Sequence, residues 1–176
     1  MLGAAGALCC LMAGTAAGGW MNACRTVRLE MLCAVLDVLH SMRMLLETER
    51  LSLPELLKAS AEYAGTGEGA RVVQKRWETA AEQLRTEPLT EIAAAYASAS
   101  RQHPLAWEQA EEKQALESLF SQLGMGTAAM REQSVAACIR RLKPLCEKAH
   151  AEAERSGKLC IQLGMLLGLM AGIVLW

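Results

Sequence analysis

The chain has 176 residues, of which 52% are hydrophobic, and a formal net charge of −1 at neutral pH. This near-neutral charge argues against a protein that binds nucleic acid chiefly by charge attraction. All 18 basic and all 19 acidic residues lie between Arg25 and Lys158, so that neither end of the chain carries a charged side chain. We therefore predict a transmembrane helix over residues 1–24, a cytosolic helical domain over 25–158 and a second transmembrane helix over 159–176.

The first uncharged segment is long enough to cross a bilayer, but it is rich in Ala and Gly rather than Leu. A cleaved signal peptide is the alternative, because the small residues at 15–19 resemble a cleavage site. Signal peptides begin with a basic region, however, and no basic residue precedes this apolar run. The pattern favours an uncleaved anchor.

The middle domain is predicted to be all-α, with about six helices and no sheet. Apolar residues recur every three or four positions, and no segment alternates apolar and polar residues as a strand does. The first of these helices covers residues 28–47. Its apolar stripe consists of Leu32, Leu36, Leu39, Met42 and Leu46.

Typical helix-start residues mark the second helix. Ser52 is a good N-cap, Pro54 suits a first helical turn, and Glu55 completes a capping box. We expect this helix to end near Tyr63, before a loop that contains Gly65, Gly67 and Gly69. The glycine spacing is reminiscent of a phosphate-binding loop, but no Gly-Lys-Ser/Thr follows it, so a plain interhelix loop is favoured.

Four more helices follow in the predicted domain. The third covers 72–84, a fourth restarts at Thr86 and Pro88, and a fifth starts at Pro104 and ends at Leu123-Gly124. The last helix carries a near-heptad apolar stripe over 135–153 and is expected to continue into the C-terminal anchor.

Glycines recur at every fourth position in both predicted anchors. In lipid, such rows of small residues let helices approach closely, so the rows predict helix packing surfaces. The alternative is that Gly is simply frequent in membrane helices. The two rows consist of Gly164, Gly168 and Gly172 in the second anchor and Gly14 and Gly18 in the first.

The basic residues nearest to the two anchors predict the topology. Arg25 and Arg28 follow the first anchor, and Arg155 and Lys158 precede the second. By the positive-inside rule, both basic flanks and the domain between them lie in the cytoplasm, with both termini across the membrane.

Little in the sequence indicates chemistry. The seven cysteines are odd in number and include no Cys-x-x-Cys pair in the middle domain, which is typical of free thiols in a reducing compartment. No set of ligands for a metal and no cofactor motif is present. Cys146 and His150 lie one helical turn apart and are the one candidate for nucleophilic catalysis, although a surface His beside a buried Cys explains them better.

Two charge-rich stretches, 108–117 and 147–155, mix acidic and basic residues. A solvated face with weak ion pairs is the simple interpretation. A docking surface for a partner is the alternative, and composition does not separate the two.

Several stretches together resemble the stage III sporulation protein AB family. They are Leu53-Pro54-Glu55-Leu56-Leu57, then Leu123-Gly124 followed by Gln133, and Gly157-Lys158-Leu159 leading to Leu163-Gly164-Met165-Leu166-Leu167-Gly168-Leu169. The resemblance covers the whole chain, including its two uncharged ends.

The resemblance implies a protein of the mother-cell membrane that faces the forespore in a spore-forming bacterium. It also implies a cytosolic helical domain similar to the inner-membrane platform proteins of type II secretion and type IV pilus systems. The implied partners are a secretion-type ATPase, the other proteins of the sporulation channel and the lipid bilayer. A second copy of the chain is a further candidate partner. The resemblance transfers no catalytic residue.

The resulting hypothesis is a non-enzymatic platform component of a channel between mother cell and forespore. A membrane-anchored helical sensor or adaptor is the alternative from another class. A membrane-tethered enzyme that uses Cys146 and His150 is the third hypothesis.

Overall fold

The computed structural model describes residues 2–48, 51–105 and 109–174, and within them the side chains of residues 23, 26–48, 51–105 and 109–155. The described residues form six α-helices and no strand, so the predicted all-α class is confirmed. The helices are α1 (Leu2–Thr48), α2 (Leu53–Ala61), α3 (Glu68–Thr86), α4 (Ile92–Gln102), α5 (Ala110–Leu123) and α6 (Ala128–Val174).

The chain folds into two units. One, here called the helical unit, is Arg28–Glu147, and the other consists of Met1–Val27 with Lys148–Trp176. Among the described residues, no helix combines the length and the apolarity that a membrane crossing requires. The predicted anchors over 1–24 and 159–176 lie almost entirely outside the residues whose side chains are described, so they stay predictions.

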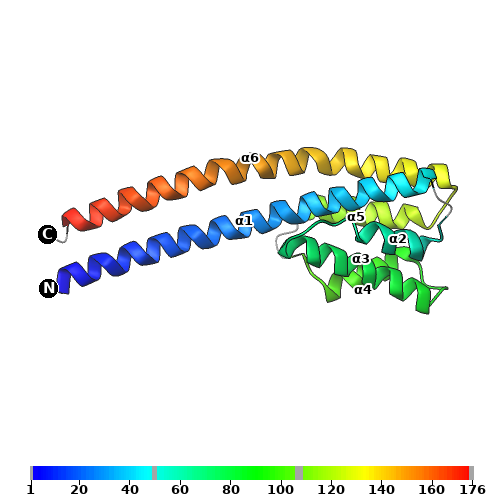
Figure 1. The fold of residues 1–176 in the computed structure, drawn as a ribbon, viewed down its shortest axis with the longest axis horizontal. Helices are drawn as coiled ribbons and strands as arrows, with labels where there is room; N and C mark the ends of the chain where they lie inside the picture. The colour runs from blue at the N-terminus through cyan, green and yellow to red at the C-terminus, as the bar shows by residue number, and fades with distance from the viewer. Residues whose placement is uncertain (1, 49–50, 106–108, 175–176) are drawn as a thin grey trace. The chain divides into compact units, whose positions relative to one another are not determined.

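Connections between consecutive helices alternate between the two ends of the helical unit (Figure 1). The α2–α3 and α4–α5 connections lie at the end where Arg28 and Glu147 mark the entry and exit of the chain. We call this the exit end. The α1–α2, α3–α4 and α5–α6 connections lie at the other end, which we call the far end. An even number of helices therefore returns the chain to the end where it entered.

A capping box fixes the start of α2, as predicted. The carboxylate Oε2 of Glu55 accepts hydrogen bonds from the Ser52 hydroxyl at 2.6 Å and from the Ser52 backbone N–H at 3.0 Å. These two bonds, the hydroxyl one first, hold the pKa of Glu55 below its usual value. The negative charge at the first turn also complements the helix dipole.

Three aromatic rings from three helices form the centre of the core. Tyr96 of α4 and Phe120 of α5 stack with ring centroids 3.8 Å apart, and Trp77 of α3 meets both rings edge-on. All three are nearly fully buried. Burial of such rings contributes heavily to the stability of a small domain.

Arg76 is fully buried beside this cluster, which the apolar pattern of α3 did not predict. Its guanidinium donates two hydrogen bonds to the backbone carbonyl of His103, at 3.1 and 2.9 Å, and one to the Tyr96 hydroxyl at 3.1 Å. His103 is the C-cap of α4, where the helix dipole is negative. Arg76 thus fastens α3 to the exit end of α4.

Two predicted helix starts are wrong. The fourth helix begins at Ile92 rather than at 86–88, because α3 continues to Thr86 and Pro88 lies in a turn closed by the Thr90 N–H on the Glu87 carbonyl at 3.0 Å. The fifth begins at Ala110 rather than at Pro104. Its start is set by a second capping box, in which Glu112 accepts the Gln109 N–H at 3.0 Å.

The predicted apolar stripe of the first helix is partly correct. Leu32, Leu39 and Met42 are buried, whereas Leu36 and Leu46 lie at the edge and are only half-buried. The face is centred on other residues, including Val35 and Val38, which are at most 2% exposed. The residues of the predicted stripe over 135–153 in α6 are all buried or half-buried; they are Val135, Cys138, Ile139, Leu142, Leu145, Ala149 and Ala153.

Candidate functional site

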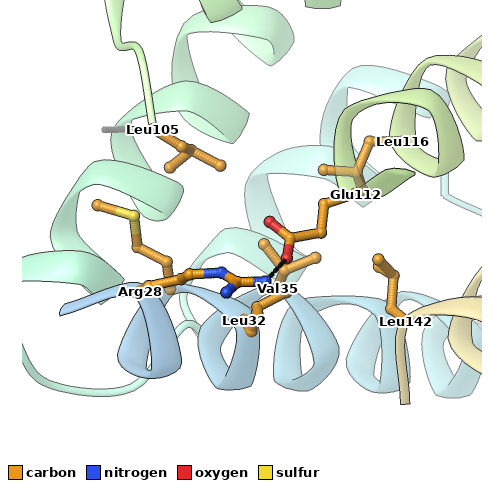
Figure 2. A pocket seen from close by; sticks show the side chains of 8 residues that line it. Arg28, Leu32, Val35, Leu105, Glu112, Leu116 and Leu142 are labelled. Carbon is orange, nitrogen blue, oxygen red and sulfur yellow. Dashed lines mark hydrogen bonds and ion pairs between the residues drawn. The ribbon is translucent and has the colours of Figure 1, made fainter. Parts of the chain in front are cut away.

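A small cavity lies between α1, α5 and α6 at the exit end of the helical unit (Figure 2). An ion pair crosses it: Nη2 of Arg28, from α1, donates to Oε1 of Glu112, from α5, at 2.6 Å. The two side chains are 17% and 5% exposed. The cavity is lined by Arg28, Met31, Leu32, Val35, Leu105, Glu112, Leu116 and Leu142.

This cavity is a structural feature rather than a binding site. Its volume of about 20 Å³ leaves room for about one water molecule, far less than the several hundred Å³ of an ordinary ligand pocket. Glu112 performs two structural tasks there, because it pairs with Arg28 and also caps α5. The prediction that the stretch 108–117 is a solvated face is therefore wrong at Glu112, which is 4% exposed.

A much larger groove of about 670 Å³ opens at the far end. We call it the end groove. Its apolar surface comes from the starts of α2 and α4 and the ends of α3 and α5, which the alternating connections bring together. Its lining consists of Leu53, Pro54, Leu84, Pro88, Thr90, Glu91, Ile92, Ala93, Phe120, Ser121, Gly124 and Met125.

Large apolar side chains project from the loops around the end groove. Leu89, between the groove residues Pro88 and Thr90, is fully exposed, and Met125 is 71% exposed. Exposed apolar side chains grouped around a groove are typical of a protein interaction site. A single exposed Leu would carry no such meaning, but here the side chains flank the same hollow.

Acidic side chains predominate beside this apolar surface. Glu91 lines the end groove, and Glu87 lies in the same turn as Leu89. A second hollow of about 520 Å³ shares Pro54 with the groove. Its charged lining residues are Glu55, Glu78, Glu82, Lys58 and Arg85. Acidic groups thus outnumber basic ones here, so a partner with basic groups around an apolar stripe fits this surface.

The basic residues that predict the topology have different environments in the structure. Arg28 is in the ion pair with Glu112, and Arg155 is exposed. Arg25, Lys158 and the glycines of both predicted packing rows, Gly14, Gly18, Gly164, Gly168 and Gly172, lie outside the residues whose side chains are described.

Cys146 and His150 each have another partner. The Sγ atom of Cys146 lies 3.5 Å from Sγ of Cys33, and His150 Nδ1 lies 3.8 Å from a Glu154 carboxylate oxygen. Burial, followed by the adjacent Cys33 thiol, raises the pKa of Cys146 to about 12. A thiol with such a pKa is rarely ionised at neutral pH, which argues against Cys146 as the primary nucleophile of an enzyme; a thiol already in contact with its target is less restricted. Within the described residues, no group of three or more His, Cys, Asp or Glu side chains has a metal-binding arrangement.

Sequence reasoning missed the end groove, although one signal for it was present. Leu89 is a large apolar residue in a short segment without helical periodicity, between Pro88 and Thr90. Such a residue has no helix face on which to be buried. The Cys33–Cys146 contact had no comparable signal, because the two residues are 113 positions apart in sequence.

The model of one protein family, stage III sporulation protein AB, matches residues 3–176 of the chain. The chain belongs to the stage III sporulation protein AB family. This result confirms the resemblance predicted from the sequence and indicates a role related to sporulation. No curated protein and no solved structure matches the chain.

Proposed function

We propose that this member of the stage III sporulation protein AB family is a non-enzymatic platform component of a channel between mother cell and forespore. Its two uncharged ends would anchor it in the mother-cell membrane, and its helical unit would lie in the cytoplasm. The family membership supports the sporulation role. The end groove is the observation that supports a platform, because a platform must receive another protein.

The end groove suits a protein ligand better than a small molecule. It is open and lined by four helix ends, its lining residue Met125 is exposed, and Leu89, between two lining residues, is fully exposed. Its apolar surface and acidic surroundings fit a helix or loop with apolar anchors and basic flanks. We propose that this ligand belongs to a secretion-type ATPase or to another channel protein.

Site-specific photo-crosslinking in sporulating cells tests this assignment. A photoreactive amino acid replaces Ser121, which is exposed and lines the groove. The matched control replaces Tyr63, which is 51% exposed but lies at the exit end. We expect Ser121 to yield crosslinks to the ATPase or to a channel protein and Tyr63 to yield none. The same crosslinks from both positions would contradict docking in the end groove.

The proposed topology is tested with a membrane-impermeant thiol reagent. The variant used keeps Cys33 as its one cysteine. Because this thiol is exposed on the helical unit, any reagent that reaches the helical unit can label it. We expect labelling only after the cells are permeabilised. Labelling of intact cells would place the helical unit outside the cytoplasm.

The glycine row of the C-terminal segment has its own test. Gly168→Leu makes the segment more apolar and so preserves insertion, but it blocks close helix approach. We expect assembly with membrane partners to fall about ten-fold, which corresponds to roughly 1–2 kcal/mol. Leu167→Ile is the matched control on another helix face. Equal association of the two variants, measured by crosslinking yield at equal protein level, would show that the row has no packing role.

A further inference from the structure

Two thiols from opposite ends of the sequence meet in the helical unit. Cys33 lies on α1 and Cys146 on α6, and their Sγ atoms are 3.5 Å apart. Both are free thiols, Cys33 exposed and Cys146 half-buried. A disulfide has an S–S distance of about 2.05 Å, so the two sulfurs, already in contact, would have to approach further for a bond to form.

The position of the pair determines what a bond between the two sulfurs would constrain. Cys33 lies just over one helical turn after Arg28, and Cys146 immediately precedes Glu147, so the pair joins α1 and α6 where both leave the helical unit. Because 113 positions separate the two residues, a bond between them would close nearly the whole unit into one loop. Covalent closure of so long a loop strongly restricts the unfolded chain.

We propose that Cys33 and Cys146 form a reversible oxidation site, at which a peroxide converts the two thiols into a disulfide that ties α1 to α6. In a reducing compartment the pair rests as two thiols. The function proposed above is not needed for this inference.

The reaction consumes one molecule of hydrogen peroxide. The Cys33 sulfur attacks the peroxide, so that an S–O bond forms and the O–O bond breaks. Cys33 is oxidised to a sulfenic acid, and the leaving hydroxide takes the thiol proton to become water. The Cys146 sulfur then attacks the Cys33 sulfur. An S–S bond forms, the S–O bond breaks, and the departing hydroxide takes the Cys146 proton as a second water.

The surroundings assign these two roles. Cys33 is the exposed thiol and therefore meets the oxidant first. Cys146 is partly shielded and next to Cys33, which suits the resolving thiol. Asp37 and Glu147 put negative charge near the pair, as their effect on the Cys146 pKa shows. An uncharged oxidant such as hydrogen peroxide is therefore favoured over an anionic one.

Peptide mass spectrometry of the full chain tests the proposal. The variant used keeps Cys33, Cys138 and Cys146 and has Ala at Cys9, Cys10, Cys24 and Cys160. It is purified in detergent under reducing conditions and then treated with hydrogen peroxide. We expect an intramolecular Cys33–Cys146 crosslink with a loss of about 2 Da, reversed by a dithiol reductant. The unfolding temperature of the oxidised protein should rise by about 5–10 °C.

Single substitutions provide the controls. Cys33→Ser and Cys146→Ser should each abolish the crosslink, whereas Cys138→Ala should retain it. Cys138 is buried on the same helix, and its thiol faces the Ala115 carbonyl at 3.7 Å. Peroxide treatment that yields only overoxidised Cys33, or only disulfides between two copies of the chain, would overturn the proposal.

A trivalent arsenical gives a second measurement that involves no oxidation. Phenylarsine oxide reacts with two neighbouring thiols to form two As–S bonds and one water. We expect one equivalent to bridge Cys33 and Cys146, to block the peroxide crosslink, and to be displaced by a dithiol far better than by a monothiol. Failure of the arsenical to bridge the pair in the folded protein would mean that the thiols are not jointly accessible, which would contradict the proposed site.

Discussion

The two ends of the helical unit are built on different principles. At the exit end, charged groups are buried and joined across helices, by Arg28 with Glu112 and by Arg76 with the His103 carbonyl. At the far end, apolar side chains line an open groove, and Leu89 is fully exposed. Polar residues are thus enclosed at one end while apolar residues face solvent at the other.

This difference between the two ends separates the residues that stabilise the fold from those that would bind a partner. Buried polar contacts depend on exact placement, since a lost partner leaves a desolvated group behind, so they fix how the helices are held. An open apolar groove adds little to stability until another molecule covers it. Substitutions at the exit end should therefore affect folding, and substitutions at the far end should affect binding.

The largest effect is expected at Arg76. Arg76→Ala removes the hydrogen bonds to the His103 carbonyl and the Tyr96 hydroxyl, both of which lose this donor, and opens a cavity in the core. We expect the free energy of unfolding to fall by about 3–5 kcal/mol. Denaturant titration of the full chain in detergent measures it. Arg85→Ala, on the exposed face of the same helix, is the control and should cost less than about 0.5 kcal/mol.

A somewhat smaller loss of stability is expected from Glu112→Ala. The substitution removes both the anionic partner of Arg28 and the cap of α5. We expect a cost of about 2–4 kcal/mol, because the ion pair is almost enclosed. Glu111→Ala, one position earlier and exposed, is the matched control. Equal costs for the two variants would mean that the ion pair contributes nothing beyond a surface charge.

These two residues also show what sequence could and could not predict. The existence of the helices follows from local spacing, because a buried stripe such as Trp77, Ala80, Ala81 and Leu84 repeats with the helical period. The same period gives no warning that Arg76 is buried, since a neighbouring helix end supplies its partners. Arg28 and Glu112 are 84 positions apart, and local spacing does not encode such a pairing. Pro88 and Pro104 lie in the connections before α4 and α5 rather than in the first turns of these helices, so the proline signal predicts both helix starts several residues too early.

At the far end, Leu89→Glu should change association rather than stability. The side chain is fully exposed, so we expect the free energy of unfolding to stay within about 0.5 kcal/mol of the original. Loss of an apolar anchor, and the cost of desolvating a charge placed against the partner's apolar stripe, should weaken partner association about ten-fold, or roughly 1.4 kcal/mol. The crosslinking yield at Ser121 measures this change. An unchanged yield would show that Leu89 takes no part in the interface.

The smallest effect concerns Glu55, at the start of α2. Its lowered pKa means that the carboxylate stabilises the fold above its ordinary value of 4.5, and that this contribution is lost as the pH falls through the lower folded value. Glu55→Gln should therefore lower the unfolding temperature slightly at pH 7, and this difference in unfolding temperature should narrow as the pH falls below 4.5. Glu62→Gln, at the other end of the helix, reports the effect of removing one charge alone. A gap that widens in acid would contradict the capping role.

The return of α6 to α1 also determines when the domain can fold during synthesis. Leu142 completes the lining around Leu32 and Val35, yet it leaves the ribosome more than a hundred residues after them. At a synthesis rate of roughly 5–20 residues per second, the apolar face of α1 lacks the cover of Leu142 for about 5–20 s in each new chain. A chain cut short before α6 leaves the part of the α1 face around Leu32 and Val35 without Leu142, so the last helix completes the cover that limits aggregation of the nascent chain.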